Sequence, residues 1–330
     1  MKNNVIISNL TTGYKQKQGT KIISKELNLS IRTNELVLLM GPNGCGKSTL
    51  MNTISGLLKP IKGEVTISNH PLKKIKSKDM SKLLSLVLTD RIHAPQLTVQ
   101  EVVEVGRYPY VGQMGILSAK DKMIIKDSIE RCNLVGYEHR FYVELSDGEK
   151  QRVMIARALT QDTPLMLLDE PTAHLDLPSR LDVMMMLRRL TEETNKTVLV
   201  STHELDIALQ WADTIWLMAK GGEVYHGSPE DLILNGHIEK VFGNNQLKFD
   251  PEKGEFSVIR TQNLPISIKG EGLRLKWTIR ALERKGFSPI ISHSEDSQID
   301  ISEHCWKYNN EEYLSLRELL IALEMNYEQE

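Results

Sequence analysis

The sequence has little of what marks several common classes of protein. It has no apolar stretch near the length of a membrane span and no signal-peptide pattern, so we expect neither segment. The formal net charge is only −2, and no run of lysine and arginine is interleaved with aromatic residues. Nucleic-acid binding is therefore not expected. The cysteines are Cys45, Cys132 and Cys305. Their odd number and wide spacing predict a reduced protein without disulfides or a cysteine metal site.

Residues 36–54 have the pattern of a strand, a glycine-rich turn and a helix. The apolar run at 36–40 is typical of a buried strand, and residues 48–54 have helical spacing. The glycines between them allow backbone N–H groups to approach phosphate oxygens at the start of the helix. Lys47 would contribute charge to the β- and γ-phosphates, and Ser48 would offer a hydroxyl to Mg²⁺. The residues expected to bind nucleotide are Gly41, Asn43, Gly44, Cys45, Gly46, Lys47, Ser48 and Thr49.

Two acidic residues follow the apolar run at residues 165–168. Asp169 and Glu170 come directly after these four residues, which are typical of a buried strand. Ligands of open α/β sheets bind at the carboxyl ends of the strands. We expect Asp169 to hold Mg²⁺, directly or through water, and Glu170 to polarise the water that attacks the γ-phosphate.

Residues 145–152, Leu-Ser-Asp-Gly-Glu-Lys-Gln-Arg, resemble the signature peptide of the ATP-binding-cassette (ABC) superfamily. Together with the phosphate loop and the acidic pair, they give a resemblance that extends over residues from about 4 to 245. We therefore assign residues 1–245 to an ABC nucleotide-binding domain. The resemblance implies an α/β fold with a P-loop, RecA-like core, an antiparallel β subdomain, and a helical subdomain at about 97–150. It also implies ATP and Mg²⁺ as cofactors and ATP hydrolysis as the activity.

The resemblance implies further roles for single residues. Residues 171–176 match the D-loop of the family, His203 matches its catalytic switch histidine, and Tyr14 matches the aromatic residue that stacks on adenine. In the family, the Ser and the second Gly of the signature contact the γ-phosphate bound to the opposite subunit. Ser146 and Gly148 hold these positions. A second copy of the chain is therefore the expected partner, in a head-to-tail dimer.

The chain departs from the family pattern in its signature and its Q-loop. The common signature has Gly where this chain has Asp147 and Gln where it has Glu149. We expect the Asp147 side chain to point away from the phosphate. Thr89 stands where the family has the Q-loop glutamine. Its hydroxyl can contact a water or Mg²⁺, but it has a shorter reach. Thr89 therefore joins Ser48 and Asp169 as a candidate for the metal site.

The composition changes near residue 245. Residues 246–262 are polar and rich in turn-forming residues, which predicts a linker. Residues 263–330 alternate strand and helix patterns, which predicts a small α+β accessory domain. The expected strands are at 266–269, 288–292 and 298–301, and the expected helices are at 273–282 and 313–323. Because so small a domain has a marginal core, we expect it to pack against the ATPase domain or its twin.

Residues 98–110 discriminate among ABC proteins. Their sequence is similar to the T-V-x-E-x-V-x-x-G-R-x-P-[YW] pattern of ATPase subunits that serve importers of iron–siderophore complexes, haem and cobalamin. This resemblance implies a peripheral subunit on the cytoplasmic face of the inner (plasma) membrane. Integral permease subunits would dock on residues 89–110. A periplasmic or extracytoplasmic substrate-binding protein would be an indirect partner, and no nucleic acid is expected.

Another class of ABC protein stays open as the alternative. A soluble ABC ATPase of an assembly system, such as the iron–sulfur cluster assembly type, also has one cassette and no membrane span. ABC proteins of translation carry two cassettes and a linker, and those of DNA repair interrupt the cassette with a coiled coil. This sequence has neither feature. The sequence does not name the cargo, because the permease and its binding protein choose it.

Overall fold

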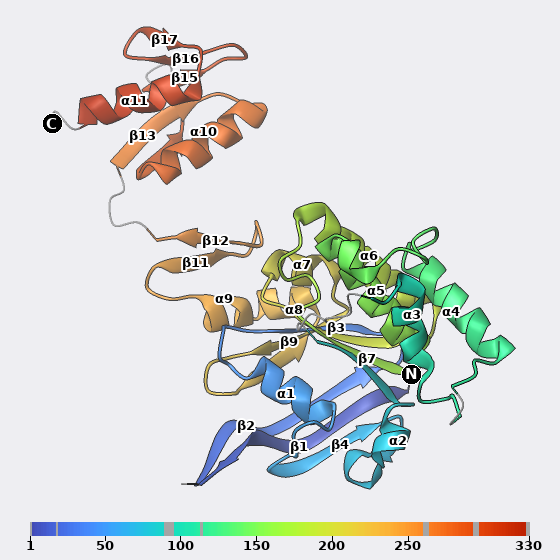
Figure 1. Ribbon diagram of the computed structural model, residues 1–330. Helices are drawn as coiled ribbons and strands as arrows, with labels where there is room; N and C mark the ends of the chain where they lie inside the picture. Colours follow the sequence, from blue (N-terminus) through green and yellow to red (C-terminus); the bar gives the residue numbers. More distant parts are fainter. Residues whose placement is uncertain are drawn as a thin grey trace. The chain divides into compact units, whose positions relative to one another are not determined.

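The computed structural model describes residues 2–17, 19–88, 96–112, 115–259, 264–292 and 297–327. The chain divides into two compact units (Figure 1). Unit 1 comprises Met1–Asn244 and Phe249–Phe256, and unit 2 comprises Asn245–Lys248 and Ser257–Glu330. In the described part of the chain, no helix has both the length and the apolar character needed to cross a bilayer.

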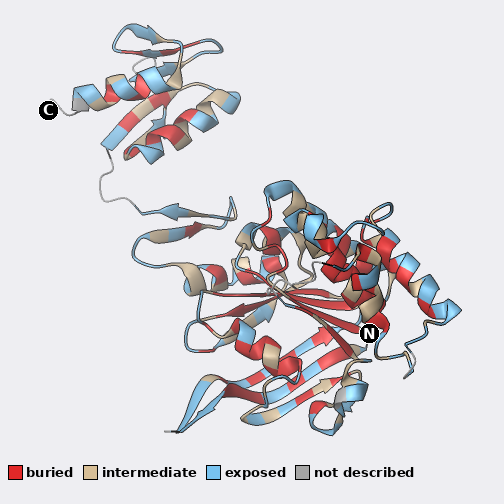
Figure 2. Cartoon of the chain, viewed as in Figure 1, coloured by how far each residue is buried: buried red, intermediate tan, exposed pale blue. Residues whose placement is uncertain are grey.

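A six-stranded sheet forms the centre of unit 1. The strands are β3 (Leu36–Met40), β6 (Leu84–Val87), β7 (Leu165–Asp169), β8 (Thr197–Ser201), β9 (Thr214–Met218) and β10 (Val224–Gly227). Their order is β10-β9-β3-β8-β7-β6, and all neighbours are parallel except β10 and β9. A parallel sheet that is covered on both faces needs apolar residues throughout. Every residue of the central strand β3 is buried, as Figure 2 shows for the middle of the sheet.

The two faces of this sheet belong to two hydrophobic cores. Side chains alternate between the faces of a strand, so Leu36 and Leu38 of β3 enter one core, whereas Val37 and Leu39 enter the other. The first core includes residues of α3 (Val99–Glu104), α4 (Ala119–Arg131), α5 (Asp147–Thr160), α6 (Leu177–Glu193), α7 (Leu205–Trp211), α8 (Pro229–Leu234) and α9 (His237–Phe242). The second core includes residues of α1 (Lys47–Ile54) and of an antiparallel sheet.

The antiparallel β subdomain and the helical subdomain implied by the resemblance are both present. The antiparallel sheet has the order β2-β1-β4-β5 and contains β1 (Asn3–Gln16), β2 (Gly19–Arg32), β4 (Lys62–Ile67) and β5 (His70–Pro71). The helices α3, α4 and α5 supply the helical subdomain. The described residues of unit 1 also form three 3-10 helices (Leu72–Lys74, Val105–Arg107 and Tyr142–Glu144) and the short α2 (Ser77–Met80).

The described residues of unit 2 form a five-stranded sheet and two helices. Its elements are β13 (Leu264–Lys269), α10 (Gly272–Arg284), β14 (Phe287–Ile291), β15 (Ile299–Ile301), β16 (Trp306–Tyr308), β17 (Glu311–Tyr313) and α11 (Leu316–Tyr327). The strand order is β14-β13-β15-β16-β17, with β13 parallel to both of its neighbours. Both helices and the sheet contribute to one hydrophobic core. The sequence did not predict β16 or β17, and Tyr313 ends β17 where a helix was expected.

The segment predicted as a linker, residues 246–262, contains two strands. β11 (Leu247–Asp250) and β12 (Glu255–Val258) form a two-stranded sheet. Phe249 is buried in the first core of unit 1, and its ring centroid lies 5.0 Å from that of Phe256. The Phe256 ring also meets Phe242 of α9 edge to face. These aromatic contacts anchor the hairpin, so unit 1 includes residues beyond the predicted boundary at 245.

Candidate active site

The loop between β3 and α1 is closed by Lys47. Lys47 is the first residue of α1, and its buried Nζ donates a 2.8 Å hydrogen bond to the backbone oxygen of Gly41. Gly46 precedes the helix with φ 116°, and a Cβ at this position would lie 2.3 Å from Cγ2 of Ile23. Only glycine fits this backbone. The loop therefore combines a buried cation with the free N–H groups of a helix start, which suits a bound phosphate.

The other predicted nucleotide contacts lie on this loop or beside it. The exposed ones are Asn43, Gly44 and Ser48, and the buried ones are Cys45 and Thr49. Burial raises the pKa of the Cys45 thiol, which keeps it protonated at neutral pH. Tyr14 of β1 shares a 3.0 Å hydrogen bond between its hydroxyl and Oγ1 of Thr49. The fold thus brings the predicted adenine-stacking residue to the first turn of α1.

The acidic pair lies at the carboxyl end of β7, where β8 also ends. The parallel register pairs Asp169 with Ser201. The Ser201 hydroxyl donates to Oδ1 of Asp169 at 2.5 Å and accepts from the backbone N–H of Glu170 at 2.9 Å. Glu170 has φ 47°, a left-handed conformation that is uncommon outside glycine and persists only where its surroundings hold it. Ser201 supplies part of that support.

His203 follows β8 and approaches the same carboxylate. Its Nδ1 lies 3.7 Å from Oε1 of Glu170, and 55% of its side chain is exposed. The Glu170 side chain is 31% exposed. The structure therefore brings Glu170 and His203, the two residues predicted to be catalytic, together at the neighbouring carboxyl ends of β7 and β8, where both are accessible to solvent.

The signature peptide opens α5. Ser146 is the N-cap residue: its hydroxyl accepts from the backbone N–H of Glu149, and its own N–H donates to the Glu149 carboxylate at 2.7 Å. This capping box lowers the pKa of Glu149, chiefly through the backbone hydrogen bond from Ser146. A Cβ at Gly148 would lie 2.9 Å from Oγ of Ser179 in α6, so glycine allows the two helices to approach closely. Ser146 and Asp147 are exposed.

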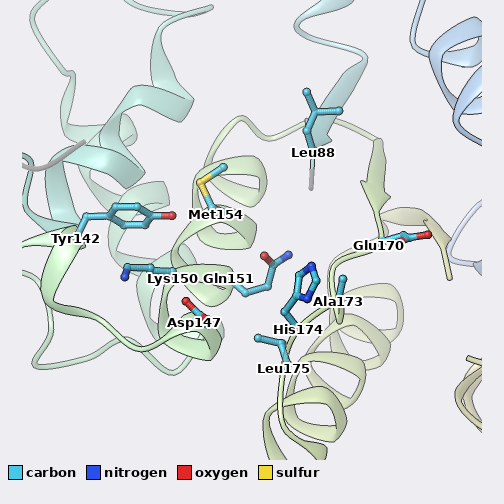
Figure 3. Close-up of a pocket in the computed structure, with 10 residues that line it drawn as sticks. All are labelled: Leu88, Tyr142, Asp147, Lys150, Gln151, Met154, Glu170, Ala173, His174 and Leu175. Atoms are coloured by element: carbon cyan, nitrogen blue, oxygen red, sulfur yellow. The ribbon is translucent and has the colours of Figure 1, made fainter. Parts of the chain in front are cut away.

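A pocket separates α5 from the D-loop (Figure 3). Lys150 and Gln151 of α5 line one side, and His174 and Leu175 of the D-loop line the other, as Figure 3 shows. The remaining lining residues are Leu88, Tyr142, Asp147, Met154, Glu170 and Ala173. Leu88 follows β6 and precedes Thr89, the Q-loop candidate, which lies outside the described residues.

Sequence patterns did not single out several residues that support the site. Ser201 links Asp169 to Glu170, but its role depends on the register between two parallel strands, which no local motif reveals. Glu204 accepts hydrogen bonds from Thr172 and Arg180. The only local signal for Glu204 was its position directly after His203.

Two family models match the chain. One, described as ABC transporter, matches residues 24–173, and the other, described as Iron ABC transporter C-terminal domain, matches residues 263–324. An uncharacterized ABC transporter ATP-binding protein of Methanocaldococcus jannaschii is 35% identical over 293 residues, which cover 86% of this chain and 98% of that protein. The iron(3+)-hydroxamate import ATP-binding protein of Bacillus subtilis is 35% identical over 241 residues, which cover 73% of this chain and 88% of that protein.

A solved structure agrees with these relatives. The dimeric structure of a bacterial ABC transporter cassette is 31% identical, with a TM-score of 0.59, and the match covers 68% of this chain and 98% of that one. A phosphate loop after the central parallel strand and an acidic pair after β7 define a P-loop ATPase. Within that class, the chain belongs to the family of ABC transporter ATP-binding proteins. The resemblance seen in the sequence and the fold that it implied are confirmed.

Proposed function

We propose that this chain is the ATP-hydrolysing subunit of an importer for iron–siderophore complexes, with haem and cobalamin as the related cargoes of the same group. One observation carries the proposal: a single chain combines the ABC signature and phosphate loop with a C-terminal segment that matches an iron-transporter family. The similarity to an iron(3+)-hydroxamate import protein supports the same cargo class. The subunit would act on the cytoplasmic face of the membrane.

The nucleotide would be held by the phosphate loop and Tyr14. Lys47 would exchange its hydrogen bond with Gly41 for the β- and γ-phosphates, because a phosphate offers more negative charge than a carbonyl oxygen. Tyr14 would stack on adenine, and its present bond to Thr49 already holds it beside the loop. The exposed loop residues Asn43 and Gly44 would contribute backbone contacts.

The chemical step would depend on Glu170. Its carboxylate would polarise the attacking water, and His203, 3.7 Å away, would keep the water and the γ-phosphate in position. Ser48 and Asp169 present the hydroxyl and carboxylate oxygens that suit Mg²⁺, which neutralises charge on the phosphates when bound. Ser201 would fix Asp169 in the orientation needed for that role.

The active form would be a head-to-tail dimer. In a monomer the signature has no nucleotide of its own to contact, and Ser146 is exposed at the start of α5. In the proposed dimer, Ser146 and Gly148 contact the γ-phosphate held by the phosphate loop of the other copy. The positive end of the α5 dipole would add to this contact. The resemblance to a dimeric cassette supports the arrangement.

The permease would dock on the helical subdomain beside residues 98–110. Arg107 is buried there; its Nε donates to Oδ1 of Asp121 at 2.8 Å, and its Cζ lies 4.0 Å from the centre of the Tyr110 ring. Tyr108, in contrast, is 71% exposed. The contacts of the buried Arg107 with Asp121 and Tyr110 therefore hold this segment in place, and Tyr108 stays exposed. Large exposed aromatic side chains of this kind are typical of protein interfaces.

Reconstitution tests the proposal. The chain would be purified together with a polytopic membrane protein encoded beside it and placed in liposomes with ATP and Mg²⁺. We expect ATP-dependent uptake of a ferric hydroxamate, and no uptake when the Glu170→Gln variant replaces the wild type. Copurification of soluble assembly proteins in place of a polytopic membrane protein would favour the assembly-system alternative instead.

A further inference from the structure

Two adjacent residues of the loop after β8, His203 and Glu204, make contacts in different surroundings. The side chain of His203 is 55% exposed and lies near Glu170. The next side chain, Glu204, is only 10% exposed. Adjacent residues of one short loop therefore divide their contacts between the reaction site and the protein interior.

Glu204 accepts hydrogen bonds from one residue of the D-loop and from one residue of α6. Its Oε1 accepts from Oγ1 of Thr172 at 2.9 Å, and its Oε2 accepts from Nη1 of Arg180 at 2.5 Å. Arg180 also donates from Nε to the backbone oxygen of Leu175 at 3.1 Å. Thr172 and Leu175 both belong to the D-loop, residues 171–176. One carboxylate and one guanidinium thus tie the D-loop, the start of α6 and the histidine loop together.

The D-loop and Glu170, the residue directly before it, have a backbone that needs such support. Glu170 and His174 both adopt left-handed conformations, with φ 47° and 65°, and neither is glycine. Residues of this kind keep their conformation only where their surroundings fix it. A charge-assisted bond to a mostly buried carboxylate is strong and directional. A movement of the D-loop would therefore displace Glu204. Because His203 is the preceding residue, its position would change as well.

We propose that Glu204 and Arg180 are positioning residues that couple the conformation of the D-loop to the position of His203 relative to Glu170. The proposal rests on the ATPase function proposed above. Within one chain, the D-loop and the signature helix line the same pocket (Figure 3). A change at that pocket when the dimer closes would reach the histidine by way of Glu204. Glu204 and Arg180 would act without contacting the nucleotide.

The first test compares two variants of acidic residues that pair with arginines of α6. Glu204→Gln keeps the shape and can still accept from Thr172, but it loses the charge that faces Arg180. We expect kcat for ATP hydrolysis to fall about tenfold while KM for ATP changes less than about twofold. Glu192→Gln is the control, because Glu192 pairs with Arg188 on the exposed face of the same helix. Its activity should stay at the wild-type level.

The second test asks whether Glu204 acts through His203. His203→Ala would be combined with Glu204→Gln, and hydrolysis would be followed with radiolabelled ATP. If the coupling is real, the double variant loses no more activity than His203→Ala alone. Independent, multiplicative losses would overturn the proposal, as would a Glu204→Gln variant with normal kcat.

A milder variant guards against a folding defect. Thr172→Val removes one hydroxyl and keeps the shape of the side chain, and we expect an intermediate loss of kcat with an unchanged melting temperature. A loss that follows melting temperature across the three variants would mean a purely structural role and would overturn the proposal. Wild-type protein without ATPase activity would instead count against the proposed function, so the two failures can be told apart.

Discussion

The two units of this chain both pack helices on a sheet with parallel strands, but they differ where those strands end. In unit 1, β7 ends at Asp169 and is followed directly by Glu170, and β8 ends in a buried serine, Ser201, that hydrogen-bonds to both residues. One of these, Glu170, has a left-handed backbone. Polar groups and backbone strain are thus concentrated at one edge of the sheet, which is the pattern expected of a reaction site.

In unit 2, a buried polar contact joins a helix to the sheet inside the core. Trp306 of β16 donates from Nε1 to Oγ1 of Thr278 in α10 at 2.8 Å, and both residues are buried. Cζ of Arg274, on the same helix, lies 3.9 Å from the centre of the Trp306 ring. These contacts join helix to sheet and serve packing. The candidate reaction site therefore lies in unit 1, whereas the contacts described in unit 2 stabilise its own core. Substitutions in the core of unit 2 should leave ATPase activity unchanged.

The largest expected effect lies at Glu170 of unit 1, whose backbone is left-handed. Glu170→Gln should retain ATP binding but lower turnover by about a hundredfold or more, because the amide cannot polarise the water. The variant should accumulate as an ATP-bound dimer. Binding of a fluorescent ATP analogue and phosphate release would be measured side by side. Turnover at the wild-type rate would remove Glu170 from its assigned role.

Lys47→Ala should affect binding rather than turnover alone. Removal of the buried ammonium takes away the loop's own charge, and we expect affinity for ATP to fall at least about tenfold. Lys59→Ala, at an exposed lysine just beyond α1, is the control and should bind normally. Isothermal titration with MgATP distinguishes the two. Equal affinities would separate the loop from nucleotide binding.

Ser146→Arg should block dimer formation while each copy still binds ATP. The long cation would occupy the place of the phosphate held by the other copy. Ser118→Arg is a matched control, because Ser118 also caps a helix through a capping box, but outside the signature. Size-exclusion chromatography with ATP should show the dimer for Ser118→Arg only. If both variants dimerise, the signature does not act across the interface.

Two truncations measure how far unit 1 depends on the β11–β12 hairpin and on unit 2. A chain that ends at Arg260 keeps the β11–β12 hairpin and should retain ATP binding and hydrolysis within about twofold. A chain that ends at Asn244 loses Phe249, which is buried in the first core of unit 1. Loss of one such ring costs about 3–5 kcal/mol, so the melting temperature should fall markedly. Loss of ATP binding in the longer, folded truncation would show that unit 2 completes the nucleotide site.

The smallest expected effect lies in the core of unit 2. Thr278→Val leaves the buried Trp306 N–H without its acceptor and should destabilise unit 2 by about 1–3 kcal/mol. ATPase activity should not change. Thr278→Ser keeps the hydroxyl and should recover most of the loss. Chemical unfolding followed by tryptophan fluorescence gives the stability, and a parallel change in kcat would contradict the independence of the two units.

Local signals predicted local features well. A Ser or Thr followed three residues later by an acidic residue is such a signal, and the pairs Thr98–Glu101 and Ser118–Asp121 form capping boxes at the starts of α3 and α4. Short strands were harder, because the three residues of β16 or β17 show too little alternation to separate them from a loop. The β11–β12 hairpin was missed for another reason. Its turn-forming residues dominate the composition, whereas its stability comes from the contacts of Phe249 with distant residues.

The candidate site divides along the same line. The residues of the predicted phosphate loop form one continuous segment, so the sequence shows them as a local motif. The bonds of Ser201 and Glu204 join segments that lie about thirty residues apart along the chain, at Asp169 and Thr172. Sequence spacing gives no register for such pairs. These supporting residues become visible only when the strands are placed side by side.

The position of β3 in the central sheet sets an order of events during synthesis. This strand, at residues 36–40, lies between β8 and β9 in the sheet, at residues 197–201 and 214–218, and pairs with both. The antiparallel sheet, in contrast, draws all four strands from residues 3–71. As the chain leaves the ribosome, that sheet can assemble early, because its pairings are close in sequence. The strand that carries the phosphate loop must wait, unpaired and apolar, until most of unit 1 has emerged. Nascent chains of this protein should therefore depend on chaperones mainly during that interval.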